Sequence, residues 1–239
     1  MIYLNLESFQ AQILFSNATN MVEFVKLTLK TIEYLLTTWH GNTKVQPPYL
    51  CIDDVNLHRA FLINQDGHKI ISFGFEFYIK TYDKILTSPN NSITNLNYLG
   101  QKGNVTTKEV SNAFTILSEY AQREDNSYWG LNLDEGDISD PSMFFFEYLL
   151  MKETGYVRYD NDIRGEKTNI HPRYHLDVNY SYPTHYKIGL AKDVSLEQFM
   201  TVLDLHKKCL IIELNPGKSA YQKRIYNKAS KRKSKRKHY

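Results

Sequence analysis

The chain has 239 residues, of which 42% are hydrophobic and 23% charged, and its formal net charge is +3. These proportions supply enough apolar surface for a substantial core and exclude a wholly disordered, collagen-like or disulfide-dense chain. Two widely separated cysteines without a CxxC partner argue against a structural zinc knuckle. Without a secretory signal or an apolar run of about 18 residues, we expect a soluble, cytoplasmic protein in a reducing compartment.

The first predicted element is an amphipathic helix over residues 20–38. Asn20 and Glu23 have the spacing of a capping box, in which each side chain bonds the backbone N–H of the other residue. Apolar residues then recur at helical spacing, at Val22, Val25, Leu29, Ile32 and Leu36. Such a stripe is typical of a helix that packs against a core.

A β-hairpin is predicted next, with strands at 59–64 and 68–80. The Asp66-Gly67 dipeptide between them favours a type I′ turn, which requires positive φ at both central positions. With this turn, Leu62 lies opposite Ile71, and the two strands agree on which face is buried.

Residues 87–104 are rich in Ser, Asn and Gly, and we expect a long surface connection there. It is the candidate subdivision within a single domain that spans residues 1–213. A second helix is predicted from Thr106, whose capping-box partner is Glu109. The acidic stretch 134–140 lacks the ligand spacing of an EF-hand, so we interpret it as a solvated loop in preference to a calcium site.

The rest of the domain is predicted to form strands followed by a helix. The strands are expected at 144–151, 155–160, 174–181 and 185–191. The helix begins after Ser195, whose capping-box partner is Gln198. The order of helices, hairpin and β-meander indicates an α+β fold with three main helices.

One polar cluster is present, in the run His171-Pro-Arg-Tyr-His175-Leu-Asp177-Val-Asn179. Because strand side chains alternate, His175, Asp177, Asn179 and Ser181 share one face. Pairing this strand with 185–191 so that the apolar residues meet sets Asn179 beside Lys187 and Ser181 beside His185. Arg158 and Asp160 extend the same face from the preceding strand.

This polar face has the donors of a metal centre. We predict that a divalent ion is bound by His171, His175 and Asp177, because imidazole together with carboxylate suits transition metals. The residues expected to hold a phosphate group are Lys187 and Arg158, and the expected acid or base is His185. The alternative is an ordinary solvated sheet face, on which Asp177 and Lys187 form a cross-strand pair of little energetic value.

The charge is divided between residues 1–213 and the tail, residues 214–239. The tail has ten Lys and Arg residues and no acidic residue, which leaves 19 basic against 26 acidic residues, or −7, in residues 1–213. Because like charges repel, we expect the tail from about Ser230 to be disordered unless a polyanion neutralises it. Nucleic acid is the favoured polyanion, and the alternatives are an acidic protein partner or no specific role. The residues expected to contact nucleic acid are Lys223, Arg224, Lys228, Lys231, Arg232, Lys233, Lys235, Arg236 and Lys237.

Four motifs lie between about residues 150 and 205: Tyr156-Val-Arg-Tyr-Asp160, His171-Pro-x-x-His175-x-Asp177, Lys187-Ile188 and Leu196-Glu-Gln-Phe199. Together they resemble the C-terminal signature of a family of uncharacterised prokaryotic proteins, with Y-x-R-[FY]-D, H-P-x-x-H-x-H and R-I-P strands and a helix entered with E-F. Asp177 replaces the third histidine of that signature, and Lys187-Ile188-Gly189 replaces its arginine triplet. A carboxylate can replace imidazole as a metal ligand, so the predicted site is compatible with the change. The resemblance implies a prokaryotic or mobile-element origin and a place in a phage-defence or toxin system, without specifying a reaction.

Two functions are compatible with these patterns. The first is a metal-assisted nuclease or phosphodiesterase, for which the tail raises the local concentration of nucleic acid. The second is a non-catalytic binding module or accessory subunit, in which the tail anchors RNA or DNA and the sheet face recognises a partner.

Overall fold

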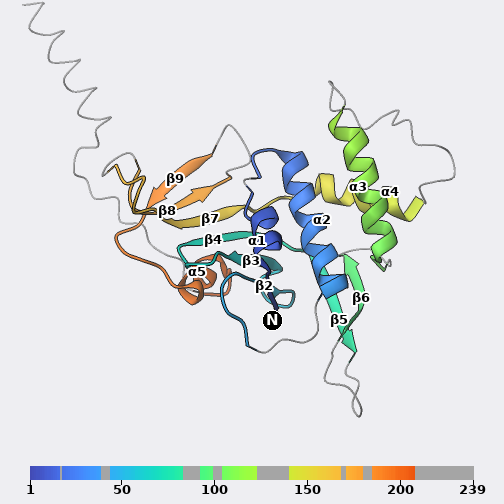
Figure 1. Ribbon diagram of the computed structural model, residues 1–239, viewed down its shortest axis with the longest axis horizontal. Helices are drawn as coiled ribbons and strands as arrows, with labels where there is room; N and C mark the ends of the chain where they lie inside the picture. Colours follow the sequence, from blue (N-terminus) through green and yellow to red (C-terminus); the bar gives the residue numbers. More distant parts are fainter. Residues whose placement is uncertain are drawn as a thin grey trace, which may run out of the picture. The chain divides into compact units, whose positions relative to one another are not determined.

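The computed structural model describes residues 1–16, 18–38, 44–82, 92–98, 104–122, 140–167, 171–179 and 185–207. Met1–Asp204 forms one compact unit, and Leu205–Tyr239 forms a second. The first unit has the predicted α+β architecture (Figure 1). Its elements in chain order are β1 (Ile2–Asn5), α1 (Ser8–Leu14), α2 (Met21–Thr38), β2 (Tyr49–Asp53), β3 (Arg59–Ile63), β4 (Lys69–Gly74), β5 (Phe77–Tyr82), β6 (Ser92–Tyr98), α3 (Thr107–Ala121), α4 (Asp140–Met151), β7 (Val157–Asn161), β8 (Tyr174–Val178), β9 (Tyr186–Gly189) and α5 (Leu196–Leu203).

Seven strands form one antiparallel sheet in the order β1-β2-β3-β4-β7-β8-β9. β5 and β6 form a separate two-stranded sheet. The pairing of β4 with β7, in which Ile71 lies opposite Arg158, joins the hairpin to the C-terminal meander. The polar face of the meander therefore lies on the same side of the sheet as Ile71 of the hairpin.

The predicted hairpin register is confirmed, because Leu62 lies opposite Ile71. The predicted turn type is wrong: of its two central residues, Gly67 alone has a positive φ, 72°. The Gly67 N–H donates to Asn64 O over 3.0 Å, and the Lys69 N–H donates to Asn64 Oδ1 over 2.9 Å. The Asn64 side chain thus stabilises a turn that needs one left-handed residue and not two.

The predicted second hairpin strand, 68–80, is interrupted. β4 ends at Gly74, and β5 begins at Phe77 in the other sheet. The Gly74 N–H donates to Thr154 O over 2.8 Å, and a Cβ at position 74 would lie 3.3 Å from Glu153 O. The missing side chain lets the segment after α4 approach the sheet at the point where the strand breaks.

The three predicted helices are confirmed, including their N-terminal ends. The Glu23 N–H donates to Asn20 Oδ1 over 2.9 Å at the start of α2. Capping boxes form at Thr106 in α3 and at Ser195 in α5. These elements were predictable because a capping box depends on residues three positions apart.

Two other predictions are wrong. The predicted strand 144–151 lies within α4, where buried Phe145, Phe146 and Leu149 are spaced three and four residues apart on a helix face. The predicted surface connection 87–104 contains β6, which pairs with β5. In the first case, nearly every residue of 144–151 is apolar, so the sequence shows neither the helical nor the strand period of apolar residues. In the second, a long-range partner provides the hydrogen bonds that local composition does not reveal.

The seven-stranded sheet separates two apolar clusters. On one face, α2 packs on the sheet (Figure 1). There the rings of Phe24 and Phe73 lie edge to face with centroids 5.8 Å apart. On the other face, Phe199 of α5 lies edge to face with Phe61 at 6.3 Å. Tyr159 of β7 belongs to this second cluster, so its neighbours Arg158 and Asp160 point to the α2 side of the sheet.

None of the helices within the described ranges combines the length and the apolar character needed to cross a bilayer. Cys51 is a buried free thiol. Several predictions concern residues outside the described ranges, namely Cys209, Ser181, residues 134–139 and the tail 214–239 with its basic residues.

Candidate metal centre

The side chains of the candidate centre come from three adjacent strands. Arg158 and Asp160 are two residues apart in β7, and His175 and Asp177 are two residues apart in β8, so each pair shares a face. The register sets Asp160 opposite His175 and Arg158 opposite Asp177. The predicted common face of His175 and Asp177, extended by β7, is thus present, and both residues are fully buried.

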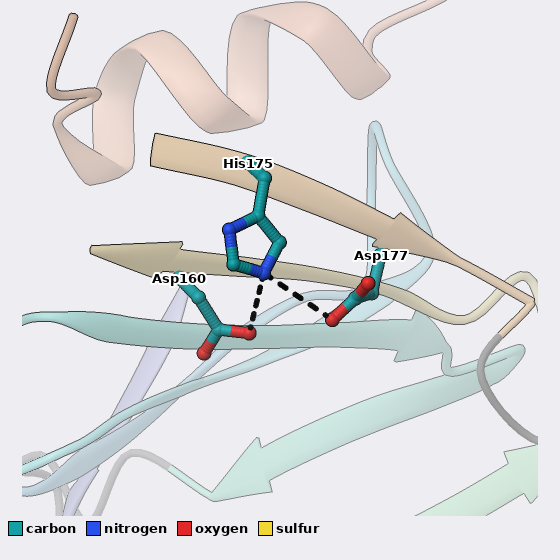
Figure 2. A group of neighbouring side chains, drawn as sticks. All are labelled: Asp160, His175 and Asp177. Carbon is teal, nitrogen blue, oxygen red and sulfur yellow. Dashed lines mark ion pairs between the residues drawn. The ribbon is translucent and has the colours of Figure 1, made fainter. Parts of the chain in front are cut away.

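The hydrogen bonds of His175 determine its tautomer. Its Nδ1 lies 2.8 Å from the carbonyl oxygen of Pro172, which can only accept, so Nδ1 carries the proton. Nε2 lies 3.5 Å from Asp160 Oδ2 and 3.6 Å from Asp177 Oδ2 (Figure 2), and in the neutral ring it has the lone pair that a metal ion would use. Metal-binding histidines show this same arrangement, with the second ring nitrogen donating to a carbonyl or carboxylate.

Asp160, His175 and Asp177 form a group that could hold a metal ion, since their ligand atoms lie within 4.8 Å of one another. An ion about 2.0–2.2 Å from nitrogen and oxygen ligands in a tetrahedral arrangement separates those ligands by roughly 3.4 Å. The Nε2 to Oδ2 distances of 3.5 and 3.6 Å are close to that separation. Three protein ligands would leave a fourth position open, as in catalytic sites.

Two cations already contact the carboxylates. Arg158 bridges them, with Nε 2.6 Å from Asp160 Oδ2 and Nη2 2.6 Å from Asp177 Oδ2. Lys187 of β9 donates to Asp177 Oδ1 and lies 3.2 Å from His175 Nε2. With a neutral imidazole, the cluster of Arg158, Asp160, His175, Asp177 and Lys187 has no net charge.

Charge pairing outweighs burial in this cluster. Burial alone would raise the pKa of Asp177, but the Lys187 hydrogen bond and the charge of Arg158 bring it below its ordinary value. Burial alone would lower the pKa of Arg158, but Asp160, Tyr156 and Asp177 raise it. Asp177 is therefore an anion and Arg158 a cation at neutral pH.

His171, the expected third ligand, lies beside the group and not within it. Its Nε2 is 3.0 Å from Asp162 Oδ2, and its ring meets the His175 ring edge to face at 4.5 Å. The Gly165 N–H and then His171 hold the pKa of Asp162 below its ordinary value. Asp160 takes the place expected for His171 because strand pairing brings it directly opposite His175.

The predicted register between β8 and β9 is wrong by two residues. Asp177 and not Asn179 lies opposite Lys187. Asn179 adopts a left-handed backbone, with φ of 54°, and ends the ladder earlier than expected. A two-residue shift leaves each side chain on its predicted face, so Lys187 still reaches the cluster. His185, the expected acid or base, is exposed and precedes the first residue of β9.

A cavity of about 680 Å³ adjoins the cluster. Arg158 and Asp160 line it, together with residues of the β3–β4 turn, the segment 161–164 and His171. Its other charged residues are the cations Lys69 and Arg164 and the carboxylates Asp66 and Asp162. The Asp160 carboxylate and the Arg158 guanidinium thus line a polar cavity large enough for a small ligand, whereas Asp177 and His175 lie behind them.

Comparisons with known proteins give no match. A scan against protein-family models, a search of curated proteins and a search of solved structures each find nothing similar to this chain. The resemblance over residues 150–205 is therefore neither supported nor contradicted and stays a prediction. The geometry of the cluster and its cavity is the basis for any functional argument.

The sequence did not single out Asp160 as a ligand. The available signal was its spacing of two from Arg158, which puts both on the strand face shared with His175. Choosing it over His171 required the pairing of β7 with β8.

Proposed function

We propose that this protein is a metal-assisted phosphodiesterase that acts on nucleic acid, with a divalent ion bound by Asp160, His175 and Asp177. The observation that carries the proposal is the convergence of three buried ligand atoms within 4.8 Å beside an open polar cavity. A divalent ion supplies Lewis acidity that stabilises the charge developing on a phosphate. Arg158 and Lys187 would supply further positive charge at the same point.

Charge supports an anionic substrate. A divalent ion would change the neutral five-residue cluster to a net charge of +2, and one phosphodiester, which has a single negative charge, would lower it to +1. The ten basic residues of the tail would hold nucleic acid through its backbone with little sequence preference. The tail would thus raise the local concentration of substrate for the centre.

One observation favours the alternative, a non-catalytic nucleic-acid or protein-binding module. Arg158 and Lys187 already compensate both carboxylates, so the cluster is satisfied without an ion. In this alternative the five residues rigidify the sheet, and the tail anchors the protein to nucleic acid.

Metal analysis and a nuclease assay separate the two functions. Purified full-length protein would be analysed for bound metal and incubated with labelled single- and double-stranded DNA and RNA in Mg²⁺ or Mn²⁺. The phosphodiesterase requires metal-dependent cleavage that His175→Ala and Asp160→Asn abolish and that His206→Ala, at an exposed histidine, retains. If wild type and all variants are equally inert and free of metal while nucleic acid still binds, the binding module is the correct function.

The resemblance over residues 150–205 adds a cellular context to this proposal, namely phage defence or a toxin system of a prokaryote. The corresponding test is bacterial growth and phage plating with wild type and His175→Ala. A defence or toxin function requires that the wild type alone changes either readout.

A further inference from the structure

Arg158 binds the two carboxylate oxygens that an ion would need. Its Nε donates to Asp160 Oδ2 and its Nη2 to Asp177 Oδ2, each over 2.6 Å. His175 Nε2 faces the same two oxygens at 3.5 and 3.6 Å. The guanidinium and an ion held by these ligands would therefore compete for one pair of oxygens.

We infer that ion binding displaces Arg158 from Asp160 and Asp177, and that the released guanidinium binds a phosphodiester in the adjoining cavity. This inference rests on the proposed metal centre and adds to it the ligand class of the cavity and the residue that couples the two sites.

Charge identifies Arg158 as the group that moves. A divalent ion would add two positive charges to a neutral, buried cluster, where unbalanced charge is costly. Lys187 donates to the other oxygen of Asp177, Oδ1, and lies 3.2 Å from His175 Nε2, whereas Arg158 occupies both of the Oδ2 atoms that the ion would need. Departure of Arg158 lowers the net charge of the ion-containing cluster to +1, and a phosphodiester in the cavity balances the charge of the released guanidinium.

The cavity provides a place for the displaced guanidinium. Arg158 already lines it, so its side chain can turn toward Lys69 and Arg164 in the same space. Three cationic side chains would then surround one anion. The planar guanidinium binds phosphate through two parallel N–H bonds, which suits it better than an ammonium to orient the group.

The lining also limits what the cavity recognises. Among the described residues that line it there is no Phe, Tyr or Trp, and the aromatic rings among them are the imidazoles of His68 and His171. Asn64, Asn161 and Asp66 offer hydrogen bonds to sugar hydroxyls and to water. The cationic and hydrogen-bonding lining therefore fits a phosphodiester backbone as the ligand class.

Linkage makes the coupling measurable in both directions. If an ion frees Arg158 to bind a phosphodiester, the phosphodiester must tighten ion binding by the same factor. Coupling factors of this kind are typically about 5- to 150-fold. Removing the guanidinium removes both the competitor of the ion and the partner of the anion, so the two affinities must change in opposite directions.

The test is calorimetric titration of the full chain with Mn²⁺, with and without saturating dimethyl phosphate as the phosphodiester probe. We expect dimethyl phosphate to tighten Mn²⁺ binding to the wild type at least fivefold. Arg158→Gln should bind Mn²⁺ about tenfold more tightly than the wild type, and dimethyl phosphate should no longer change that affinity. Arg158→Lys should retain the competition but lose most of the phosphodiester coupling. Lys26→Gln, at an exposed position of α2, is the control with the same loss of charge and should match the wild type.

The outcomes distinguish this inference from the proposed function. Equal Mn²⁺ affinities in wild type and Arg158→Gln, with coupling retained in both, would overturn the role of Arg158 and leave the metal centre intact. Absence of Mn²⁺ binding in both proteins would refute the metal centre itself. Because Arg158→Gln leaves two buried carboxylates without this partner, its thermal midpoint is measured as well. Mn²⁺ should raise that midpoint more in Arg158→Gln than in the wild type.

Discussion

Lys187 lies directly opposite Asp177 in the β8–β9 ladder, and its ammonium group donates to Asp177 Oδ1. The Asp177 side chain is fully buried, whereas that of Lys187 is 28% exposed. Arg158 holds the other carboxylate oxygen of Asp177. A buried anion is thus held between one buried cation and one that reaches solvent.

Replacing Lys187 by Met should destabilise the protein by about 1–3 kcal/mol, because one oxygen of a buried carboxylate loses its partner. The measurement is the free energy of unfolding from urea titration at neutral pH. Lys192→Met is the matched control, since Lys192 is exposed in the same part of the chain, and it should change stability by no more than about 0.5 kcal/mol. Equal unfolding midpoints for the two variants would show that the Lys187 contact contributes nothing.

Asp177→Asn should cost about 3–5 kcal/mol at neutral pH, because it breaks a buried ion pair and leaves Arg158 with a single carboxylate. The pKa of Asp177 is lowered in the folded protein, mainly by Lys187 and Arg158 acting against burial. The stability that its charge provides is therefore complete above the unfolded pKa, near ~4, and is lost as pH falls through the lower folded value. Unfolding curves at neutral and acidic pH should show the difference between wild type and Asp177→Asn shrinking on acidification. A difference independent of pH would refute the charged role of Asp177.

Local signals in the sequence were sufficient for the helix starts and the hairpin. Thr106 with Glu109 and Ser195 with Gln198 each identify a helix from four consecutive residues, and Leu62 opposite Ile71 follows from one short turn. α4 could not be recognised, because its run of aromatic and aliphatic residues has neither a helical nor a strand period. Its helical form depends on packing with α3 and α2, and those contacts are distant in sequence.

The candidate site could be predicted in part for the same reason. Alternation within β8 is local, so the shared face of His175 and Asp177 followed directly from the sequence. Asp160 entered the group only through the pairing of β7 with β8. The partner of Lys187 depended on where β8 ends, which the left-handed backbone of Asn179 determines. A two-residue slip changes the neighbours but not the faces, and hydrophobic patterning cannot detect it.

Lys152 should make stability depend on pH. It is buried, its Nζ donates to Gly74 O over 2.9 Å and lies over the rings of Phe24 and Phe77, and burial lowers its pKa to about 7 against the influence of Glu76. Between pH 7 and about 10.4 the unfolded chain binds a proton that the folded protein lacks, so stability should rise with pH by up to about 1.4 kcal/mol per unit.

Lys152→Met removes this titration and should flatten the rise. The measurement is the free energy of unfolding of both proteins from pH 6 to 10, in which other groups titrate equally and cancel in the difference. The variant should be the more stable protein at pH 6, where the wild type buries a charge, and its advantage should shrink as pH increases. An advantage that stays constant or grows with pH would show that Lys152 does not lose its proton in this window.

The tail should determine how steeply nucleic-acid binding depends on salt. Replacing Lys231, Arg232, Lys233, Lys235, Arg236 and Lys237 by Gln removes six cations from the full chain. For single strands each neutralised phosphate contributes about 0.7 to the slope of log K against log salt, so the slope should fall by up to about 4. Fluorescence anisotropy of a labelled single-stranded oligonucleotide across a salt series measures this slope. Because these residues lie outside the Met1–Asp204 unit, the urea midpoint and Mn²⁺ affinity of the variant should match the wild type. An unchanged slope would show that the phosphate contacts are made by the compact unit and not by the tail. The acidic excess of the compact unit makes it the poorer binder of a polyanion.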